Sequence, residues 1–476
     1  MKKIFYTLCS LKLAVLIILS LALALVLGTL IESQYDTPTA QYWVYQSKVF
    51  YFLLVILGLN IFCVALSRFP WKKQHFPFLM AHFGILTLLL GSWITDRAGV
   101  DGIMRLSEGE STSVVELGSA VLITSDEDRV QAFSVPWIPP YFRFKPVSVQ
   151  LQGISHALMI DQYLTHADGI TSFVPRSHES KKKQTQKQAA VHFKLVGGVM
   201  GISQDIWLWE GSPSWKSIQL GPARFVIGKN FDSTVSEGIP QFRIGSEQDG
   251  GLSYSAKASN GSIQYGKIRE KSIQGQTIQT GWKGNPQIVL EEWIADATPL
   301  TVYHEARVQY GNQAPGSAIH IRVSSEEGVW IGLGDRAVLR LENRDVELGY
   351  FPKRIILPFS IRLERFQIDY DPGTQTPAAY SSQVSINSES GEKKNILIRM
   401  NEPLQVQGFT FYQASYEASD ELENSRPMTS ILSVNQDPGR ICKYTGSAWI
   451  VLGSLFLFAA KYRKFSRSSR LIREDV

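Results

Sequence analysis

Four apolar segments and one long segment of alternating apolar and polar residues predict a mixed membrane protein. We expect four transmembrane α-helices, three N-terminal and one C-terminal, with a large all-β, sandwich-like extracytoplasmic domain inserted between helices three and four. Because a helix rises about 1.5 Å per residue, segments of this length match the roughly 30 Å hydrocarbon core of a bilayer. The predicted spans cover about residues 13–31, 49–67, 76–95 and 444–461, in a chain of 476 residues with 19% charged residues.

These spans divide the chain into four parts. The predicted parts are a helical segment over 1–96, a β-rich domain over 97–443, the last span over 444–461 and a basic tail over 462–476. The first span has a basic start like a signal peptide, but its apolar core is longer than the usual one. The sequence IESQYDTP that follows contains no small-x-small cleavage site, so we expect a retained anchor.

Lysine and arginine residues near the span ends predict the orientation, because cytoplasmic loops are enriched in them. They precede the first span, fill the loop between the second and third spans, and follow the fourth. They are Lys2, Lys3, Lys12, Arg68, Lys72, Lys73, Lys461, Arg463, Lys464, Arg467, Arg470 and Arg473. We therefore expect both termini in the cytoplasm and the β domain on the extracytoplasmic side of a bacterial cytoplasmic or thylakoid-type membrane.

Charge and cysteine content exclude several classes of function. The net charge of +5 comes from the basic residues at the span ends, and no basic patch interleaved with aromatic residues indicates nucleic acid binding. The three cysteines, Cys9, Cys63 and Cys442, form no CxxC and no haem-attaching CxxCH motif. The chain is therefore expected to be neither a thiol oxidoreductase nor itself a c-type cytochrome.

Short alternating runs separated by Gly, Pro, Asn and Asp predict an all-β domain over 97–443. In the run 355–368, Ile361, Leu363, Phe366 and Ile368 are the expected inward residues, and Pro358 is expected at an edge or bend. The segment 165–190 is rich in Lys, Gln and Ser, so we expect a mobile insertion there. The function of the region 150–340 is not predicted.

One titratable side chain, His82, lies inside the third span. An ionisable residue within a membrane is a candidate for function, because burying it costs free energy unless it faces protein, water or a metal. The alternative is an interhelical hydrogen bond, and position alone leaves both interpretations open. For Asn60 in the second span we expect an interhelical hydrogen bond, and for His75 an exposed position at the membrane boundary.

The extracytoplasmic segment contains two patterns that resemble cofactor sites. Trp207 and Trp209 alternate in DIWLWEGSPSWK, and alternating Trp residues on a strand are more often packing than a haem platform. None of the histidines there has a second His or Cys at ligand spacing, so we expect surface or hydrogen-bonded residues. They are His156, His166, His178, His192, His304 and His320.

Specific motifs at both ends carry a resemblance to a known family. They include GTLIES at 28–33, GSWITDRAGVDGIMRLSEGE at 91–110, NEPLQVQGFTFYQASYE at 401–417 and DPG at 437–439. With three spans, a β domain and a final span, the chain resembles the ResB/CcsB family of system II cytochrome c biogenesis. The resemblance covers about residues 10–150 and 340–465 and is weak between them.

The resemblance implies a subunit of a cytochrome c synthetase, a haem lyase, acting with a polytopic ResC/CcsA-type partner. Such a complex moves haem b across the membrane and presents it to the CxxCH motif of apocytochrome c, with a thioredoxin-like thiol reductant as a further possible partner. His82 matches the family's third-span histidine, an axial haem-iron ligand paired with a histidine of the partner. No catalytic residue is assigned to this chain, so whether it is a non-catalytic or a co-catalytic subunit stays open.

Two alternatives remain. The chain could be an extracytoplasmic binding scaffold for apocytochrome or a thiol reductant, with His82 purely structural. It could also be an unrelated membrane-anchored sensor or secretion scaffold. For a sensor we would expect a cytoplasmic signalling domain, whereas only a short basic segment follows the last span.

Overall fold

The structure, a computed structural model, divides into two compact units, Met1–His166 with Arg307–Val476, and Ala167–Ala306. It describes residues 2–126, 129–140, 144–152, 157–176, 187–198, 201–228, 238–246, 251–269, 272–306, 315–323, 328–341, 344–374, 376–388, 393–417 and 428–474. The first unit contains all the long helices and the strands nearest to them in sequence. The second unit is made of strands and one short helix.

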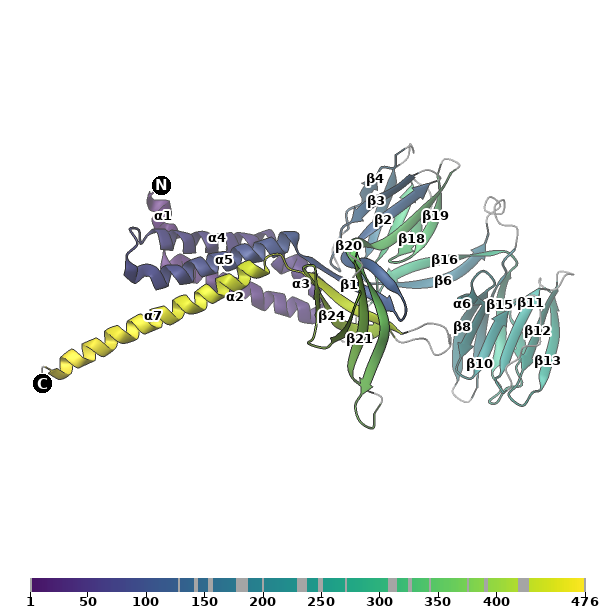
Figure 1. Cartoon of the computed structure of the whole chain (residues 1–476). Helices are drawn as coiled ribbons and strands as arrows, with labels where there is room; N and C mark the ends of the chain where they lie inside the picture. Colours follow the sequence, from purple (N-terminus) through teal and green to yellow (C-terminus); the bar gives the residue numbers. More distant parts are fainter. Residues whose placement is uncertain are drawn as a thin grey trace. The chain divides into compact units, whose positions relative to one another are not determined.

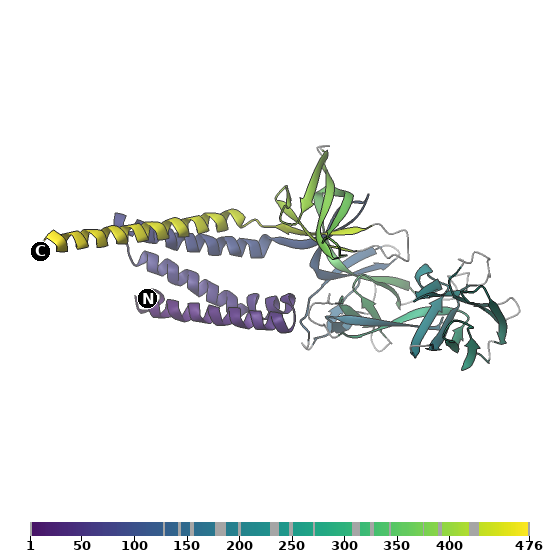
Figure 2. The same cartoon turned by 90° about the horizontal axis from the view of Figure 1, so that it is seen from below.

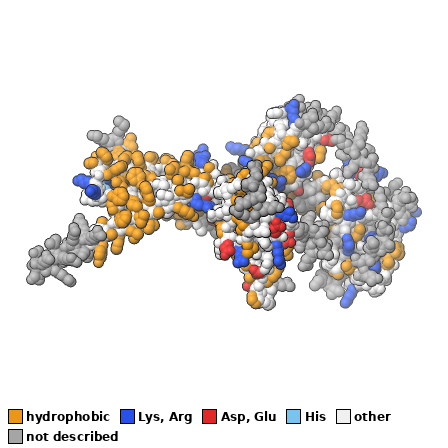
Figure 3. All heavy atoms as spheres, viewed as in Figure 1, with side chains coloured by type: hydrophobic (Ala, Val, Ile, Leu, Met, Phe, Trp, Pro, Cys, Tyr) orange, Lys and Arg blue, Asp and Glu red, His pale blue; other side chains and the backbone are white. Residues whose placement is uncertain are grey.

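Four helices of the first unit are long and apolar enough to cross a membrane, as the sequence predicts. Their large side chains are exposed along most of α2 and α4, and Figure 3 shows apolar side chains gathered over the helices, with Asp and Glu over the strands. The chain is therefore a membrane protein. The helical elements are α1 Lys2–Leu8, α2 Leu11–Gln34, α3 Thr37–Ala40, η1 Gln41–Tyr45, α4 Lys48–Leu66, η2 Lys73–His75, α5 Phe76–Ala98 and α7 Arg440–Glu474.

Polar side chains fix where the helices begin and how the first ones meet. Ser47 caps α4 by accepting a hydrogen bond from the Phe50 amide at 3.2 Å. Asn60, buried within α4, donates from Nδ2 to the carbonyl oxygens of Leu8 and Ser10. The predicted interhelical hydrogen bond of Asn60 is thus confirmed, and it ties α4 to the turn between α1 and α2.

The helix pair α5/α7 has the most extensive contact between helices in the described part of the chain. Figures 1 and 2 show the start of α7 lying alongside α5. Gly446 and Gly453 lie seven residues apart on α7, and Gly439, just before the helix, continues the same spacing. They form one stripe that allows close approach of the helices. A Cβ at Gly446 would lie 2.6 Å from the Gly84 carbonyl oxygen, and one at Gly91 would lie 2.9 Å from the Gly439 carbonyl oxygen. The two helices therefore run antiparallel with their backbones in contact.

This helix pair continues directly into a pair of strands. Strand β1 follows α5, and strand β25 precedes α7. The two strands pair antiparallel along their whole length, from Val100 opposite Gln436 to Ser107 opposite Thr429. The third and fourth spans therefore enter the β region side by side.

The strands of the first unit form two sheets. The larger has the order β22-β21-β20-β2-β1-β25-β24-β23, with β3 on β2 and β19 on β20, and the smaller has the order β18-β17-β5-β4. Their bounds are β1 Val100–Ser107, β2 Ser111–Asp126, β3 Arg129–Val135, β4 Val147–Val149, β5 Leu158–Leu164, β17 Ala318–Val323, β18 Val329–Gly332, β19 Arg336–Leu341, β20 Arg344–Tyr370, β21 Pro377–Ser388, β22 Lys393–Arg399, β23 Leu404–Val406, β24 Phe409–Glu417 and β25 Thr429–Gln436.

The second unit contains a four-stranded sheet (β14-β15-β7-β8), a five-stranded sheet (β13-β12-β11-β10-β9) and the ribbon β16-β6. The two larger sheets share one hydrophobic core, which includes Phe193, Phe225 and Phe242. The bounds are β6 Ala167–Pro175, β7 Ala190–Gly197, β8 Ile202–Trp209, α6 Pro213–Lys216, β9 Ser217–Leu220, β10 Ala223–Ile227, β11 Gln241–Ser246, β12 Gly251–Lys257, β13 Ile263–Arg269, β14 Gln276–Gln279, β15 Gln287–Ile294 and β16 Ala297–Glu305.

The all-β prediction for this region is confirmed, but the picture of one sandwich needs correction. Besides the core of the second unit, the first unit has two more cores, one on each half of the 27-residue strand β20. The pairing of β2 with β20 changes register between Ile356 and Ile361, around Pro358, where a bend is expected. The pairing changes register again between Pro352 and Arg354, and β20 passes from one core to the other in this stretch, after Tyr350 and before Leu357. A count of alternating residues does not reveal this division.

The expected inward residues of β20 are buried. Ile361 and Leu363 are inaccessible, Phe366 is 6% exposed, and Ile368 packs against the same core. The alternation skips one position between Leu363 and Phe366 because a bulge interrupts the pairing of β20 with β21 there.

The expected mobile insertion at 165–190 is wrong for part of its length. Ala167–Pro175 form β6, which pairs residue by residue with β16, and Ala190 begins β7. Residues 177–186, with the lysine run, lie outside the described residues. The polar composition misled because β6 belongs to a two-stranded ribbon, in which few side chains are buried.

The contact between α5 and α7 predicts a position-specific effect of one methyl group. Gly446→Ala should lower the free energy of unfolding by about 1–3 kcal/mol, because the new Cβ meets the α5 backbone, which cannot move aside as a flexible side chain would. Gly58→Ala is the matched control: its Cβ would lie 3.7 Å from Leu89, so it should be neutral or stabilising. Thermal unfolding of the full-length chain in detergent measures both, and equal melting temperatures for the two variants would contradict the close contact.

Candidate functional site

His82 lies on α5, two turns from the start of the helix, and its side chain is half-buried. Its Nδ1 atom is 2.9 Å from the carbonyl oxygen of Phe78, one turn earlier. Since a carbonyl oxygen can only accept a hydrogen bond, this contact assigns the proton to Nδ1. The lone pair of the neutral imidazole then lies on Nε2.

The Nε2 atom of His82 has no hydrogen-bond partner among the described residues. An atom without a partner is either buried or accessible, and the Nε2 atom is not among the buried unpartnered atoms of the described residues. It therefore opens onto the surface of this chain. The structural interpretation of His82 requires a hydrogen bond to another helix. Within the described residues His82 makes no such bond. A histidine whose Nδ1–H is held by a backbone carbonyl and whose Nε2 is free has the arrangement found in metal ligands.

Aromatic side chains and one cation surround this imidazole. The ring of Phe78 lies 3.8 Å from that of His82, centroid to centroid, and the Cζ atom of Arg68 lies 3.5 Å from the centre of the Phe78 ring. Trp71 contacts Phe83 at 6.2 Å, and its indole N–H donates to the Ala65 carbonyl oxygen at 3.0 Å. The imidazole therefore borders an aromatic patch at the N-terminal end of α5.

Metal binding by this chain alone finds no support. No group of three or more His, Cys, Asp or Glu side chains that could hold a metal ion occurs among the described residues. The side chain of His82 can supply one ligand to an iron atom, which a porphyrin would hold by its own four nitrogens. Among the described residues, the site thus offers one imidazole nitrogen and no set of side chains that could hold a metal ion by itself.

At the other end of α5 a polar cluster fastens the helix to α7. The hydroxyl of Thr95 donates to Asp437 Oδ1 at 2.6 Å, and Lys443 Nζ lies 2.7 Å from Asp437 Oδ2. Desolvation raises the pKa of the Asp437 carboxyl. The hydrogen bonds from Lys443 and Thr95 and the charges of Lys443 and Arg440 outweigh it and hold the pKa below its ordinary value. The orientation of α5, and hence of His82, depends on this cluster and on the glycine contact.

Three histidines of the β region have a carboxylate partner. His166 contacts Asp36 at 3.1 Å, His320 contacts Asp161 at 2.7 Å, and His192 contacts Asp205 at 3.2 Å. The expectation of hydrogen-bonded residues is confirmed for these three. His304, on β16, is exposed, whereas His156 and His178 lie outside the described residues.

The tryptophans of the second unit pack into a small core. Trp207, Trp209 and Trp215 each contact the ring of Phe173, at 5.3, 5.5 and 5.3 Å. Phe173 is 3% exposed. The packing interpretation of the Trp-rich stretch is confirmed.

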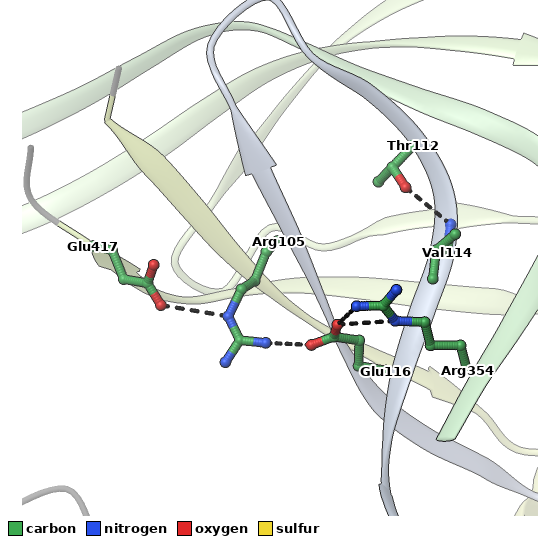
Figure 4. Close-up of polar contacts among 6 residues, drawn as sticks. All are labelled: Arg105, Thr112, Val114, Glu116, Arg354 and Glu417. Atoms are coloured by element: carbon green, nitrogen blue, oxygen red, sulfur yellow. Dashed lines mark hydrogen bonds and ion pairs between the residues drawn. The ribbon is translucent and has the colours of Figure 1, made fainter. Parts of the chain in front are cut away.

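A cleft of about 500 Å³ opens in the first unit beside β1 and β2. Glu116 lines it and bonds to both Arg105 and Arg354, the latter at 2.8 Å, while Arg105 also contacts Glu417 at 3.4 Å (Figure 4). These four residues come from β1, β2, β20 and β24, so the cluster crosslinks four strands. Because its charges are already paired, the cluster is a structural tie rather than a free ligand site.

Comparison with known proteins now adds to this geometry. Residues 314–430 match the ResB-like family. The chain therefore contains a segment similar to this family. The ResB-like segment runs from just before β17 to the first residues of β25, so it contains β20, the strand that carries two of the cores.

Two relatives match shorter stretches. Protein NrfI of Wolinella succinogenes is 34% identical over 122 residues, which are 25% of this chain and 13% of NrfI. The cytochrome c biogenesis protein CcsB of Crocosphaera subtropica is 41% identical over 75 residues, which are 16% of this chain and 17% of CcsB. The matched stretches therefore span less than a fifth of each relative.

Sequence reasoning found His82 but missed the residues that position it. Gly439, Gly446 and Gly453 have a seven-residue spacing that could have indicated a close helix contact. Phe78, four residues before His82, could have been placed on the same helix face. The approach of Arg68 to Phe78 depends on the path of the loop 67–75, for which the sequence holds no signal.

The Glu116 cluster leads to a stability prediction. Glu116→Gln should lower the free energy of unfolding by about 1–2 kcal/mol, since it removes the charge from hydrogen bonds to two arginines that are themselves about half exposed. Glu347→Gln, in the more exposed pair with Arg336, should change it by less than about 0.5 kcal/mol. Urea unfolding of the full chain followed by tryptophan fluorescence compares them, and a larger effect of Glu347→Gln would refute the assignment.

The lowered pKa of Asp437 predicts a pH dependence. A carboxyl whose folded-state pKa is depressed stabilises the fold above its unfolded pKa, about 3.9, and this contribution is lost as the pH falls through the folded value. Native protein should therefore be more stable than Asp437→Asn above about pH 5, and the difference should shrink below about pH 4. Melting temperatures across this pH range test the prediction. Asp101→Asn is the control, since Asp101 on β1 is exposed. A difference that persists unchanged in acid would argue against the ion pair.

Proposed function

We propose that this chain is a membrane subunit of cytochrome c biogenesis that carries haem across the membrane together with a polytopic partner of the ResC/CcsA type. In this role it supports covalent attachment of haem to the CxxCH motif of apocytochrome c. The match of residues 314–430 to the ResB-like family and the similarity to a relative named as a cytochrome c biogenesis protein support the biological process. The observation that carries the haem role is the free Nε2 of His82 within a span.

The chemistry of the site agrees with an apolar, planar cargo. Haem is substrate here, bound in transit and passed on. The Nε2 atom of His82 would bind the iron, the Phe78 carbonyl would hold the imidazole in the required tautomer, and the apolar α5 environment would exclude water. Because this chain provides one ligand, stable binding would require a histidine of the partner, and haem loading would depend on assembly of the complex.

The proposed topology follows from the charges. The loop between α4 and α5 contains Arg68, Lys72 and Lys73, which favour the cytoplasmic side. Four crossings then return α7 to the cytoplasm, and the β region lies on the extracytoplasmic side, where apocytochrome is matured. His82 lies two turns inside the cytoplasmic end of α5 in this arrangement.

The paired third and fourth spans suggest how the β region contributes. Since α5 continues into β1 and α7 follows β25, a movement of the His82 helix would be transmitted to the strands that pair there. The chain would thus hold haem in a span whose orientation is coupled to the extracytoplasmic domain. The same proposal includes binding of apocytochrome by that domain.

The test is the visible spectrum of the complex, purified with its partner. His82→Ala should reduce bound haem, measured by the Soret band, by at least about tenfold, the range seen when even a ligand's hydrogen-bonding partner is lost. Added imidazole should restore the band, because it can occupy the vacated coordination position. His75→Ala is the matched control: His75 lies in the short helix η2 before α5, and its replacement should leave haem content unchanged.

Unchanged haem content in His82→Ala would instead favour the scaffold function, in which the β region binds a protein partner and His82 is structural. Intact c-type cytochromes after deletion of the gene would contradict both functions.

A further inference from the structure

The contact between Arg68 and Phe78 is not explained by an iron ligand alone. Phe78 lies against two groups: the Arg68 guanidinium, at 3.5 Å from Cζ to ring centre, and the His82 ring, at 3.8 Å between centroids. Because both groups contact the same phenyl ring, a cation and an imidazole lie close together at this end of α5. A porphyrin likewise carries a metal and carboxylate side chains within one molecule.

Arg68 has no acidic partner among the described residues. The sequence contains no Asp or Glu over 1–31, 37–95 or 440–473. Accordingly, the structure shows no ion pair for Arg68 among its described residues, and the side chain is exposed. Its guanidinium can bind a carboxylate through two parallel hydrogen bonds, and stacking on Phe78 restricts its orientation beforehand. Its guanidinium is therefore open to an anion that the described residues do not supply.

The surroundings of Arg68 are suited to a flat apolar molecule with an anionic edge. Phe69 and Trp71 lie 5.9 Å apart, and Trp71 contacts Phe83, so aromatic rings border the same end of α5. The neighbouring charged groups of the loop, Lys72 and Lys73, are cationic as well. Of these cations, Arg68 is the one with a contact to the aromatic rings among the described residues, so a flat apolar surface lies next to one guanidinium, as an amphipathic porphyrin would require.

We propose that Arg68 binds a propionate carboxylate of haem while His82 binds the iron, so that the site selects porphyrins that carry free carboxylates. This inference rests on the proposed function and deepens it by naming the group that the loop before α5 recognises. Phe78 has a positioning role: its carbonyl orients His82 and its ring orients Arg68. The site then reads two chemical features of one cargo, the metal and the anionic edge.

The test compares two porphyrins on the purified complex of the full chain with its partner. Hemin and hemin dimethyl ester share the iron and the ring, but the ester lacks the negative charges. The variants are native protein, Arg68→Gln, Arg68→Lys, His82→Ala and Lys72→Gln, and the readout is the dissociation constant from Soret titrations. Native protein should bind hemin about tenfold more tightly than the ester, the effect of one charge-assisted hydrogen-bonded pair.

Each variant then has a distinct expected result. Arg68→Gln should lose this preference by weakening hemin and leaving the ester unchanged, whereas Arg68→Lys should keep part of it, since the charge remains but the fork does not. His82→Ala should weaken both porphyrins and keep the preference. Lys72→Gln should behave as native protein.

Three outcomes would overturn the assignment of Arg68. The first is a preference for hemin that survives in Arg68→Gln. The second is an equal loss of affinity for hemin and for the ester in Arg68→Gln, which would indicate a packing role. The third is a loss of preference in Lys72→Gln equal to that in Arg68→Gln, which would indicate that the positive charge of the whole loop is responsible. If His82→Ala leaves both dissociation constants unchanged, the haem function itself fails, whatever Arg68 does.

Discussion

The contact between the backbones of α5 and α7 is the constraint on which the rest of the first unit depends. Glycines at 84, 91, 439, 446 and 453 leave no side chain between the two helices, so the pair approaches until backbone meets backbone. Between lipid-exposed helices there is little hydrophobic driving force, and close packing of this kind takes its place. The Thr95–Asp437–Lys443 cluster then closes the pair at its β end.

The consequence is continuity between membrane and β region. The pairing of β1 with β25 extends the helix pair by eight residues on each chain segment, with no flexible linker between. His82 lies on the helix that is fixed in this way, and its Nε2 atom opens onto the chain's own surface. A ligand that must be shared with a second protein needs such an arrangement: a fixed helix and an open donor atom.

Much of the fold could be predicted because its signals are local. Span positions follow from apolar length, and the inward residues of β20 follow from alternation, with Ile361 and Leu363 fully buried. The failures are nonlocal. Residues 167–175 look like a polar loop by composition, yet they form β6 because β16, about 130 residues later, supplies their hydrogen bonds. Likewise, a bend around Pro358 could be expected, but not that β20 passes from one core to another between Tyr350 and Leu357.

The candidate site divides in the same way. His82 could be found because one titratable residue in an apolar span stands out, and its tautomer needed only the Phe78 carbonyl of the preceding turn. Arg68 could not, because its position over Phe78 depends on how the loop after α4 folds back.

The central claim is that the imidazole of His82 coordinates haem iron. Electron paramagnetic resonance of the ferric, haem-loaded complex tests it most directly, comparing native protein with His82→Cys. The account predicts a low-spin spectrum with two nitrogen axial ligands in native protein and a thiolate-type spectrum in the variant. An identical spectrum in both would show that the iron is held by other residues.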